Sequence, residues 1–337
     1  MHEQTPLCVG IIGCGYQGGI LAQAIGRTTS LQVTACADPD HIAAARVAKL
    51  AGNVAVYASI DALLQAATVD AVIIATPHDV LYETALAALH AGKHVLAEKP
   101  IGMDEKEAAQ LEIAVQGTDL CFMAGYSFRY IAAFQKVHAL VQANAVGEML
   151  SIAGAIGISP MSSGWEASPE TGGGPLLYVG SHLVDAMLWY LQDDPIAVVA
   201  DVCYRADTRA DETTAFQIQF ARGAVAQGMV TQTASGFFNN LDMYGRQGRI
   251  SLRGNGLHYT IDIISSALPA YTQLTTLHIP QIDDLRMLML APQLAEFAQA
   301  IQEHRQPAVT VTDGRRVLKV LDAIIKSDRT GEPVRIG

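Results

Sequence analysis

Hydrophobic and polar positions alternate in blocks along the first ~125 residues of the chain. Short, mostly apolar runs are typical of strands buried on both faces of a parallel sheet. Between these runs, apolar residues recur at helical spacing. The repeated strand–helix order predicts an α/β domain built on a doubly wound parallel sheet. Strands are predicted at 7–12, 31–37, 54–57, 69–75, 93–97 and 120–124.

Beyond residue 125 the pattern changes. Strand patterns follow one another from 196 to 279 with hairpin-like breaks and no helical crossovers, after a first strand near 150–158. This half of the chain therefore predicts an α+β domain with a mainly antiparallel sheet. Helices are predicted at about 131–145, 175–191, 292–304 and 314–327, with Pro292 in the first turn of the third.

Length and composition agree with two packed domains. The chain has 337 residues, half of them hydrophobic and 16% charged. We place the domains at 1–126 and 127–337, and the last helices either complete the second domain or pack back on the first.

Charge and cysteine usage exclude several classes of partner. The net charge of −11 argues against nucleic acid or an anionic membrane surface. No apolar run approaches the ~20 residues of a membrane span, and we see no secretory signal. The five cysteines form no C-x-x-C pair. We expect reduced thiols in a cytoplasmic protein that holds no metal.

A glycine-rich turn follows the first predicted strand. Gly13, Gly15 and Gly18 form G-x-G-x-x-G between that strand and a predicted helix. The first glycine permits a tight turn, the second lets a pyrophosphate approach the backbone, and the third lets helix and strand pack closely. The amide groups at the start of the helix then face the anionic pyrophosphate. This context predicts a dinucleotide site.

An acidic residue ends the second predicted strand. Asp38 lies about 20 residues after Gly18, as expected for a carboxylate that binds the ribose hydroxyls of a dinucleotide. An alternative is that Asp38 caps the helix that begins near Pro39. A carboxylate there repels a 2′-phosphate, and the next basic residue is Arg46. We therefore expect NAD rather than NADP.

Two further strand ends carry polar residues. Thr76 follows the fourth strand, and Lys99 follows the fifth. Ligands bind at the carboxyl ends of the strands in such sheets, so these residues should lie near the glycine-rich turn. The alternative for Lys99 is a solvated loop lysine.

Several motifs together carry a resemblance to a known family. Four further motifs follow one another along the chain. They are Ala75-Thr76-Pro77, Glu98-Lys99-Pro100, the glycine triplet 172–174 followed by Gly180 and His182, and the segment 311–316. With these motifs the chain resembles the glucose–fructose oxidoreductase / inositol dehydrogenase / rhizopine-catabolism (Gfo/Idh/MocA) family over its whole length. The resemblance implies a Rossmann domain, an open-faced sheet domain, and hydride transfer between nicotinamide C4 and a hydroxyl-bearing carbon of a sugar or cyclic polyol.

The resemblance also implies the site residues. Lys99 would bind the substrate oxygen, and Glu98 would position that lysine or the coenzyme. His182 would accept the hydroxyl proton, although a lone histidine is more often a core residue. The predicted coenzyme-binding residues are Gly13, Cys14, Gly15, Tyr16, Gln17, Gly18, Asp38, Ala75, Thr76, Pro77, His78, Glu98 and Lys99. The predicted substrate-binding residues are Lys99, Tyr126, Arg129, Trp165, Tyr178, His182 and Asp185.

Three positions depart from the family pattern. Tyr178 stands where many members have an aspartate; it either relays the proton, lines the pocket, or packs in the core. His78 replaces an asparagine, and Phe128 replaces an arginine found in some polyol dehydrogenases. These changes predict a less charged pocket than in the inositol enzymes. On a helix, Tyr178, His182 and Asp185 would share one face.

Three functions fit the sequence. The leading one is an NAD-dependent dehydrogenase or reductase of sugars, sugar derivatives or cyclic polyols. The alternatives are an NAD-dependent glycosidase that oxidises a sugar transiently, and a non-catalytic NAD-binding regulator. We also expect a homodimer or homotetramer formed through the open sheet, because its apolar face needs a cover.

Overall fold

The computed structural model forms two compact units. The first comprises the described residues up to Ser127 together with Arg286–Arg316, and the second comprises Phe128–Leu285 and Val317–Gly337. The chain therefore passes from one unit to the other at three places. The first, after Ser127, lies near the end of the predicted first domain, and the other two, after Leu285 and Arg316, lie in the C-terminal segment. The structure describes residues 5–66, 68–161, 163–256, 258–280 and 284–337.

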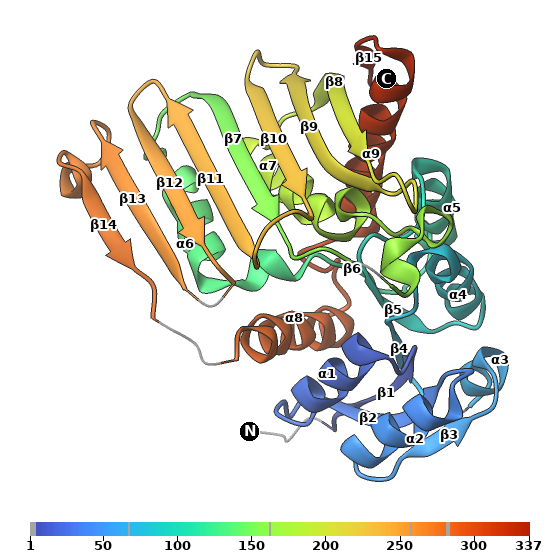
Figure 1. Ribbon diagram of the computed structural model, residues 1–337. Coiled ribbons are helices and arrows are strands. Elements are labelled where there is room, and N and C mark those ends of the chain that lie inside the picture. Colours follow the sequence, from blue (N-terminus) through green and yellow to red (C-terminus); the bar gives the residue numbers. More distant parts are fainter. Residues whose placement is uncertain (1–4, 67, 162, 257, 281–283) are drawn as a thin grey trace. The chain divides into compact units, whose positions relative to one another are not determined.

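The first unit is built on a parallel six-stranded sheet (Figure 1). The strands are parallel and stand in the order β3-β2-β1-β4-β5-β6. The chain adds β2 and β3 on one side of β1 and then β4, β5 and β6 on its other side, and this confirms the predicted doubly wound sheet. The apolar sequence of β4 and β6 is fully buried, as expected for strands covered on both faces. The strands are β1 (Leu7–Ile12), β2 (Leu31–Ala37), β3 (Ala55–Tyr57), β4 (Ala71–Ile74), β5 (His94–Glu98) and β6 (Phe122–Gly125).

Helices connect these strands, and acidic or hydroxyl side chains start three of them. Asp40, Ser59 and Asp104 each accept a hydrogen bond from a backbone amide in the first turn of α2, α3 and α5. Such caps satisfy donors that the helix itself leaves open. The helices are α1 (Tyr16–Ile25), α2 (His41–Leu50), α3 (Ile60–Leu64), α4 (His78–His90) and α5 (Glu105–Val115).

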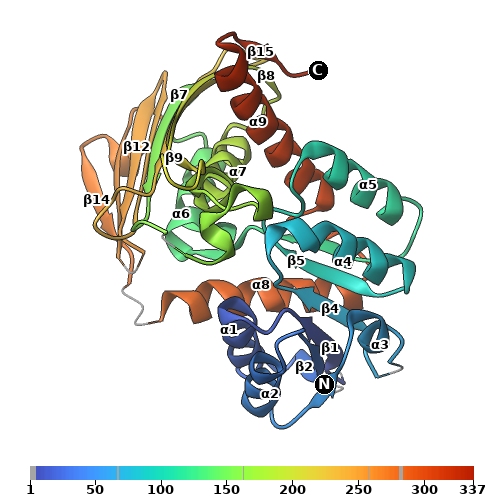
Figure 2. The same cartoon turned by 45° about the vertical axis from the view of Figure 1, so that its right-hand side comes forward.

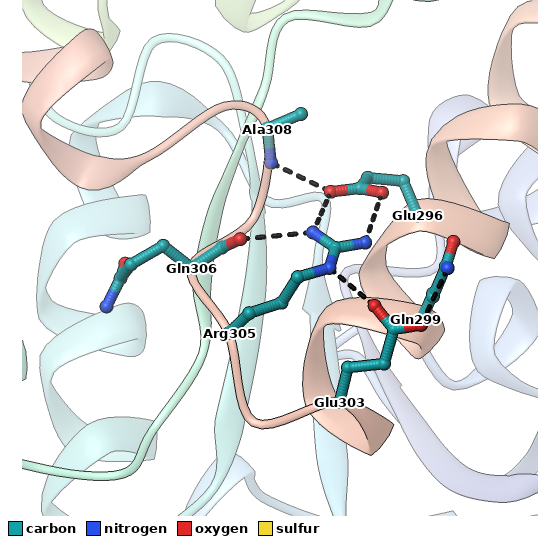
Figure 3. A network of polar contacts seen from close by, with 6 residues as sticks. All are labelled: Glu296, Gln299, Glu303, Arg305, Gln306 and Ala308. Atoms are coloured by element: carbon teal, nitrogen blue, oxygen red, sulfur yellow. Dashed lines mark hydrogen bonds and ion pairs between the residues drawn. The ribbon is translucent and has the colours of Figure 1, made fainter.

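The first C-terminal helix, α8 (Leu285–Gln302), begins earlier than predicted. We expected Pro292 in its first turn, but the proline lies inside the helix. An interior proline removes one backbone donor, but α8 continues through Pro292 to Gln302. After α8, Arg305 binds Glu296 through two nitrogens at 2.7 and 2.8 Å and Glu303 at 2.7 Å, and Glu296 also accepts the amide of Ala308 (Figure 3). This network fixes the turn that leads to the last helix.

The last helix, α9 (Val311–Thr330), starts with a reciprocal cap. The Asp313 carboxylate accepts the Thr310 amide at 2.8 Å, while the Thr310 hydroxyl accepts the Asp313 amide at 3.2 Å. Arg315 in the first turns of α9 binds Glu105 and Glu112 of α5 at 2.6 Å. The motif 311–316 that we read from the sequence therefore holds α9 against α5 within the first unit.

The second unit contains a nine-stranded sheet in the order β14-β13-β12-β11-β7-β10-β9-β8-β15. Its pairings are antiparallel except that of β7 with β10, so the sheet is mainly antiparallel as predicted. The strands are β7 (Met149–Gly157), β8 (Pro195–Tyr204), β9 (Asp211–Phe220), β10 (Val225–Thr231), β11 (Phe238–Gly245), β12 (Gly248–Gly254), β13 (Tyr259–Ser265), β14 (Thr275–His278) and β15 (Val334–Arg335).

Two helices cover one face of this sheet (Figure 2). They are α6 (Ala132–Gln142), packed on β12 and β13, and α7 (Ser181–Leu191), packed on β7 and β10. Figure 2 shows no described element of the second unit on the opposite face, so the sheet is open on that side. Val199, Met229 and Tyr244 are about two-fifths exposed on three strands of it.

The described residues show no sign of a membrane-crossing segment: none of their helices combines the length and the apolar character that this requires. The five cysteines are free, and Cys14, Cys36 and Cys121 are buried. Within the same described ranges, no group of three or more His, Cys, Asp or Glu side chains is placed to hold a metal ion.

Candidate active site

The glycine-rich turn joins β1 to α1 in the first unit. A Cβ on Gly13 would lie 2.6 Å from the backbone carbonyl of Ala75, and φ is +89° there. A Cβ on Gly18 would lie 2.0 Å from the Gly13 oxygen, whereas one on Gly15 would meet nothing within 4 Å. Two of the glycines thus allow close packing, and the third leaves open space beside the backbone.

The start of α1 offers its backbone amides to an anion. The helix begins at Tyr16, whose side chain is exposed, and the preceding Gly15 provides no side-chain cap. Amides at an uncapped helix start bind phosphate through hydrogen bonds and the helix dipole. Open space at Gly15 and a helix start without a side-chain cap fit the pyrophosphate of a dinucleotide.

Asp38 at the end of β2 is tied to this turn. Its carboxylate accepts the Cys14 amide at 2.6 Å and the Asp40 amide at 2.8 Å. Asp40, and not Asp38, caps α2, so the capping alternative was wrong. Arg46 also reaches the turn, where it donates to the carbonyls of Cys14 and Gly15 at 3.0 and 3.3 Å. This contact of Arg46 was not predicted, because no motif in the sequence relates Arg46 to the glycine-rich turn.

The ends of β4 and β5 supply the remaining polar groups of the first unit. The Thr76 hydroxyl is buried and has no hydrogen-bond partner among the described residues. Because a buried hydroxyl without a partner is costly, a bound ligand is a fitting partner for it. Pro77 precedes α4, and His78 is its first residue and is buried. Tyr126, just after β6, is also completely buried.

Lys99 follows β5 and stands beside Glu98. The Lys99–Pro100 bond is cis. Burial lowers the pKa of the Lys99 amine to about 8, although the Glu98 charge acts in the opposite direction. Burial raises the pKa of Glu98, whose carboxylate accepts the Gln17 side-chain amide at 2.7 Å and the Lys99 backbone amide at 3.3 Å. An amine with this pKa exchanges a proton readily near neutral pH.

In the second unit, the glycine triplet fixes the start of the helix that carries Tyr178 and His182. A Cβ on Gly173 would lie 2.5 Å from the Glu166 oxygen. Gly174 has φ +111°, and a Cβ there would lie 1.9 Å from the Asp211 carboxylate. That carboxylate accepts the Leu176 amide at 2.8 Å, and burial raises the pKa of Asp211 to about 6. Asp211 was not among the predicted site residues, because no spacing in the sequence relates it to the triplet.

The helix after the triplet starts with a π-helical turn, Leu176–Gly180, that leads directly into α7. Tyr178 packs edge-on against Trp165 with ring centroids 6.0 Å apart. His182 stacks on Phe128 with ring centroids 3.9 Å apart and an interplanar angle of 5°. The three residues expected on one helix face thus have different partners, because Asp185 binds elsewhere.

Arg129 and Asp185 form a buried ion pair. Arg129 Nε and one terminal nitrogen reach the Asp185 carboxylate at 3.0 and 2.6 Å, and the two side chains are 9% and 1% exposed. The guanidinium also lies 5.5 Å from the centre of the Trp189 ring. The two opposite charges therefore compensate one another at this buried position.

The parallel sheet, the open glycine-rich turn and the carboxylate at the end of β2 define a dinucleotide-binding protein. Comparison with known proteins makes this specific. Residues 7–126 match a family model described as "Oxidoreductase family, NAD-binding Rossmann fold", and residues 134–251 match the "GFO/IDH/MocA C-terminal domain". The chain belongs to the Gfo/Idh/MocA family of oxidoreductases, and NAD is its coenzyme.

Individual relatives cover nearly the whole chain. A 1,5-anhydro-D-fructose reductase of Ensifer adhaerens is 26% identical over 82% of this chain and 83% of its own length. An inositol 2-dehydrogenase of Rhizobium meliloti is 25% identical over 94% and 96%. The crystal structure of GenD2 from gentamicin A biosynthesis, in complex with NAD, has a TM-score of 0.88 at 25% identity and covers 100% of this chain and 98% of that one.

Proposed function

We propose that the protein is an NAD-dependent dehydrogenase or reductase that acts on a hydroxyl-bearing carbon of a neutral sugar, sugar derivative or cyclic polyol. In this proposal the first unit binds the coenzyme and the second contributes the groups that recognise the substrate. The observation that carries it is Lys99, an amine with a pKa of about 8 whose neighbour Glu98 is bonded to the glycine-rich turn.

NAD supplies the hydride acceptor or, when reduced, the hydride donor. In the oxidation, the carbon–hydrogen bond of the substrate breaks with its electron pair, the hydroxyl proton leaves, and a carbonyl forms. Lys99 in its charged form donates a hydrogen bond to the reacting oxygen and stabilises its developing negative charge. His182 accepts the hydroxyl proton, or Tyr178 relays it by passing on its own phenolic proton as it takes up that of the substrate, and in the reduction the same groups act in reverse.

The side chains around two of the predicted substrate-binding residues support the proposed substrate class. Arg129 and Asp185 compensate one another, and Phe128 lies against His182. Aromatic rings such as Trp165 pack well on the apolar faces of sugar rings. The names of two relatives, an anhydrofructose reductase and an inositol dehydrogenase, agree with a polyhydroxylated ligand. We infer a substrate without a carboxylate or phosphate group.

A substrate screen tests the proposal. Purified protein is mixed with NAD and, separately, NADP, and with levoglucosan, myo-inositol and simple sugars, while the absorbance of the reduced coenzyme is recorded. We expect reduced coenzyme to accumulate with NAD and at least one neutral compound. Cleavage of a chromogenic glycoside without net reduction of coenzyme would instead indicate a glycosidase.

Two variants identify the proton acceptor. If His182 accepts the proton, His182→Ala lowers turnover about 100-fold or more, because general base catalysis contributes about 10²–10⁴ in rate. Tyr178→Phe then retains most of its turnover, since the ring still packs on Trp165. The opposite order would assign the proton relay to Tyr178.

We also propose that the open face of the nine-stranded sheet joins copies of this chain. Val199, Met229 and Tyr244 support this, because they are large side chains left about two-fifths exposed. Light scattering at micromolar concentration is expected to give the mass of a homodimer or homotetramer. A monomeric mass at that concentration would reject the proposal.

A further inference from the structure

Gln17 links the glycine-rich turn to the end of β5. It lies between Gly15 and Gly18, in the first turn of α1, and its side chain is half-buried. Its side-chain nitrogen donates to Oε1 of Glu98 at 2.7 Å, across 81 positions of sequence. The backbone of Gln17 therefore belongs to the coenzyme turn, while its side chain reaches the residue before Lys99.

Both carboxylate oxygens of Glu98 are engaged. Oε1 accepts from Gln17, and Oε2 accepts the backbone amide of Lys99 at 3.3 Å. A carboxylate at a buried position stays ionised only if hydrogen bonds or opposite charges compensate its lost hydration. Burial raises the pKa of Glu98, and the Lys99 charge and the Gln17 amide both act against that rise.

The charge of Glu98 in turn acts on Lys99. Burial disfavours the ammonium form of the Lys99 side chain, and the negative charge of Glu98 favours it. A Glu98 side chain without its amide partner would lose the hydrogen bond that fixes its orientation, and it could turn away from Lys99. Lys99 would then lose the opposing charge, and its amine would become neutral at a lower pH.

We propose that Gln17 is a positioning residue for Lys99: its amide holds the Glu98 carboxylate in place and so keeps the lysine charged. This inference rests on the role proposed for Lys99 in hydride transfer. It assigns the Gln17 side chain to the lysine and leaves only its backbone for the coenzyme.

The test measures the charge state of Lys99 in the protein without substrate or coenzyme. The protein is treated briefly with an amine-acylating reagent over a range of pH, and mass spectrometry quantifies the modified peptide that contains Lys99. Only the neutral amine reacts, so the midpoint of the profile reports the pKa. In Gln17→Met we expect the midpoint to fall by about one pH unit, which makes Lys99 up to roughly tenfold more reactive near pH 7.

Matched variants separate this effect from a general disturbance of α1. Gln23→Met makes the same change at an exposed position of the same helix and should leave the profile unchanged. Glu98→Gln should lower the midpoint by itself, and the double variant Gln17→Met/Glu98→Gln should lower it no further. Gln17→Asn, whose amide is one methylene shorter, should shift it in the same direction if Gln17→Met does not fold.

Two results would overturn the inference: an unchanged Lys99 profile in folded Gln17→Met, or an additional shift from Gln17→Met in the Glu98→Gln background. The readout needs no turnover, so failure of the proposed function is seen separately. Normal turnover by Lys99→Ala would show that the proposed function of Lys99 is wrong, and the hydrogen bond between Gln17 and Glu98 would then have no role in catalysis, whatever the acylation profile shows.

Discussion

Lys99→Ala is expected to lower the turnover number about 100- to 1,000-fold, while the dissociation constant for NADH stays within about threefold of the wild-type value. The reason is that the amine acts on the charge that develops on the substrate oxygen and not on the bound coenzyme. Steady-state kinetics with the best substrate of the screen, together with NADH fluorescence titration, measure both quantities. Equal losses in coenzyme binding and turnover would show that Lys99 serves only to bind the coenzyme.

The dependence of turnover on pH tests whether the charge of Lys99 is needed for catalysis or whether the residue has only a structural role. Because burial lowers the pKa of Lys99 to about 8, the ammonium form is lost as the pH rises through that value. Turnover should therefore fall on the alkaline side with a midpoint near pH 8. Lys99→Arg keeps a permanent charge, because arginine remains protonated in proteins. Whatever turnover this variant retains should therefore not fall between pH 7 and pH 9. A rate that rises through pH 8 would assign Lys99 the role of proton acceptor instead.

Asp185→Ala is expected to destabilise the second unit by about 3–5 kcal/mol. The substitution leaves the Arg129 guanidinium, 9% exposed, without the carboxylate that it binds through two nitrogens. Both tryptophans of the chain, Trp165 and Trp189, lie in the second unit. Urea unfolding followed by tryptophan fluorescence therefore reports on this unit.

Two controls accompany this measurement. Arg129→Met/Asp185→Leu removes both charges and should cost less than Asp185→Ala, because no buried charge is left uncompensated. Arg253→Met breaks an ion pair with Asp242 in which the arginine is 43% exposed, and should change the unfolding free energy by less than about 1 kcal/mol. If Asp185→Ala cost no more than Arg253→Met, the buried pair would not hold the second unit together.

The sequence allowed a detailed prediction of the first unit. Continuous apolar strands, the three glycines and caps such as Ser59 are local signals, and each acts where it stands in the chain. The start of α8 was misplaced because Pro292 was taken as a helix start, whereas it lies inside the helix. The parallel pairing of β7 and β10 also has no local signal, because strands far apart in sequence determine it.

The candidate site was predictable where motifs carried it and hidden where contacts depend on the fold. Asp38 and Lys99 were predicted from their places at strand ends, and the structure places them directly after β2 and β5, whereas their roles stay predictions. Arg46 at the glycine-rich turn, Asp211 at the glycine triplet and the bond between Gln17 and Glu98 join residues that no spacing rule relates. The catalytic, coenzyme-binding and substrate-binding roles of all the site residues stay predictions.

The most direct test follows the hydride itself. The protein is mixed with NADH that carries two deuterium atoms at C4 and with a ketone such as 1,5-anhydro-D-fructose, and the product is analysed by mass spectrometry and NMR. The account predicts an alcohol with one deuterium on the new carbinol carbon, and a far smaller yield with Lys99→Ala. An alcohol without deuterium, or no reaction with any neutral ketone while NADH is bound, would contradict it.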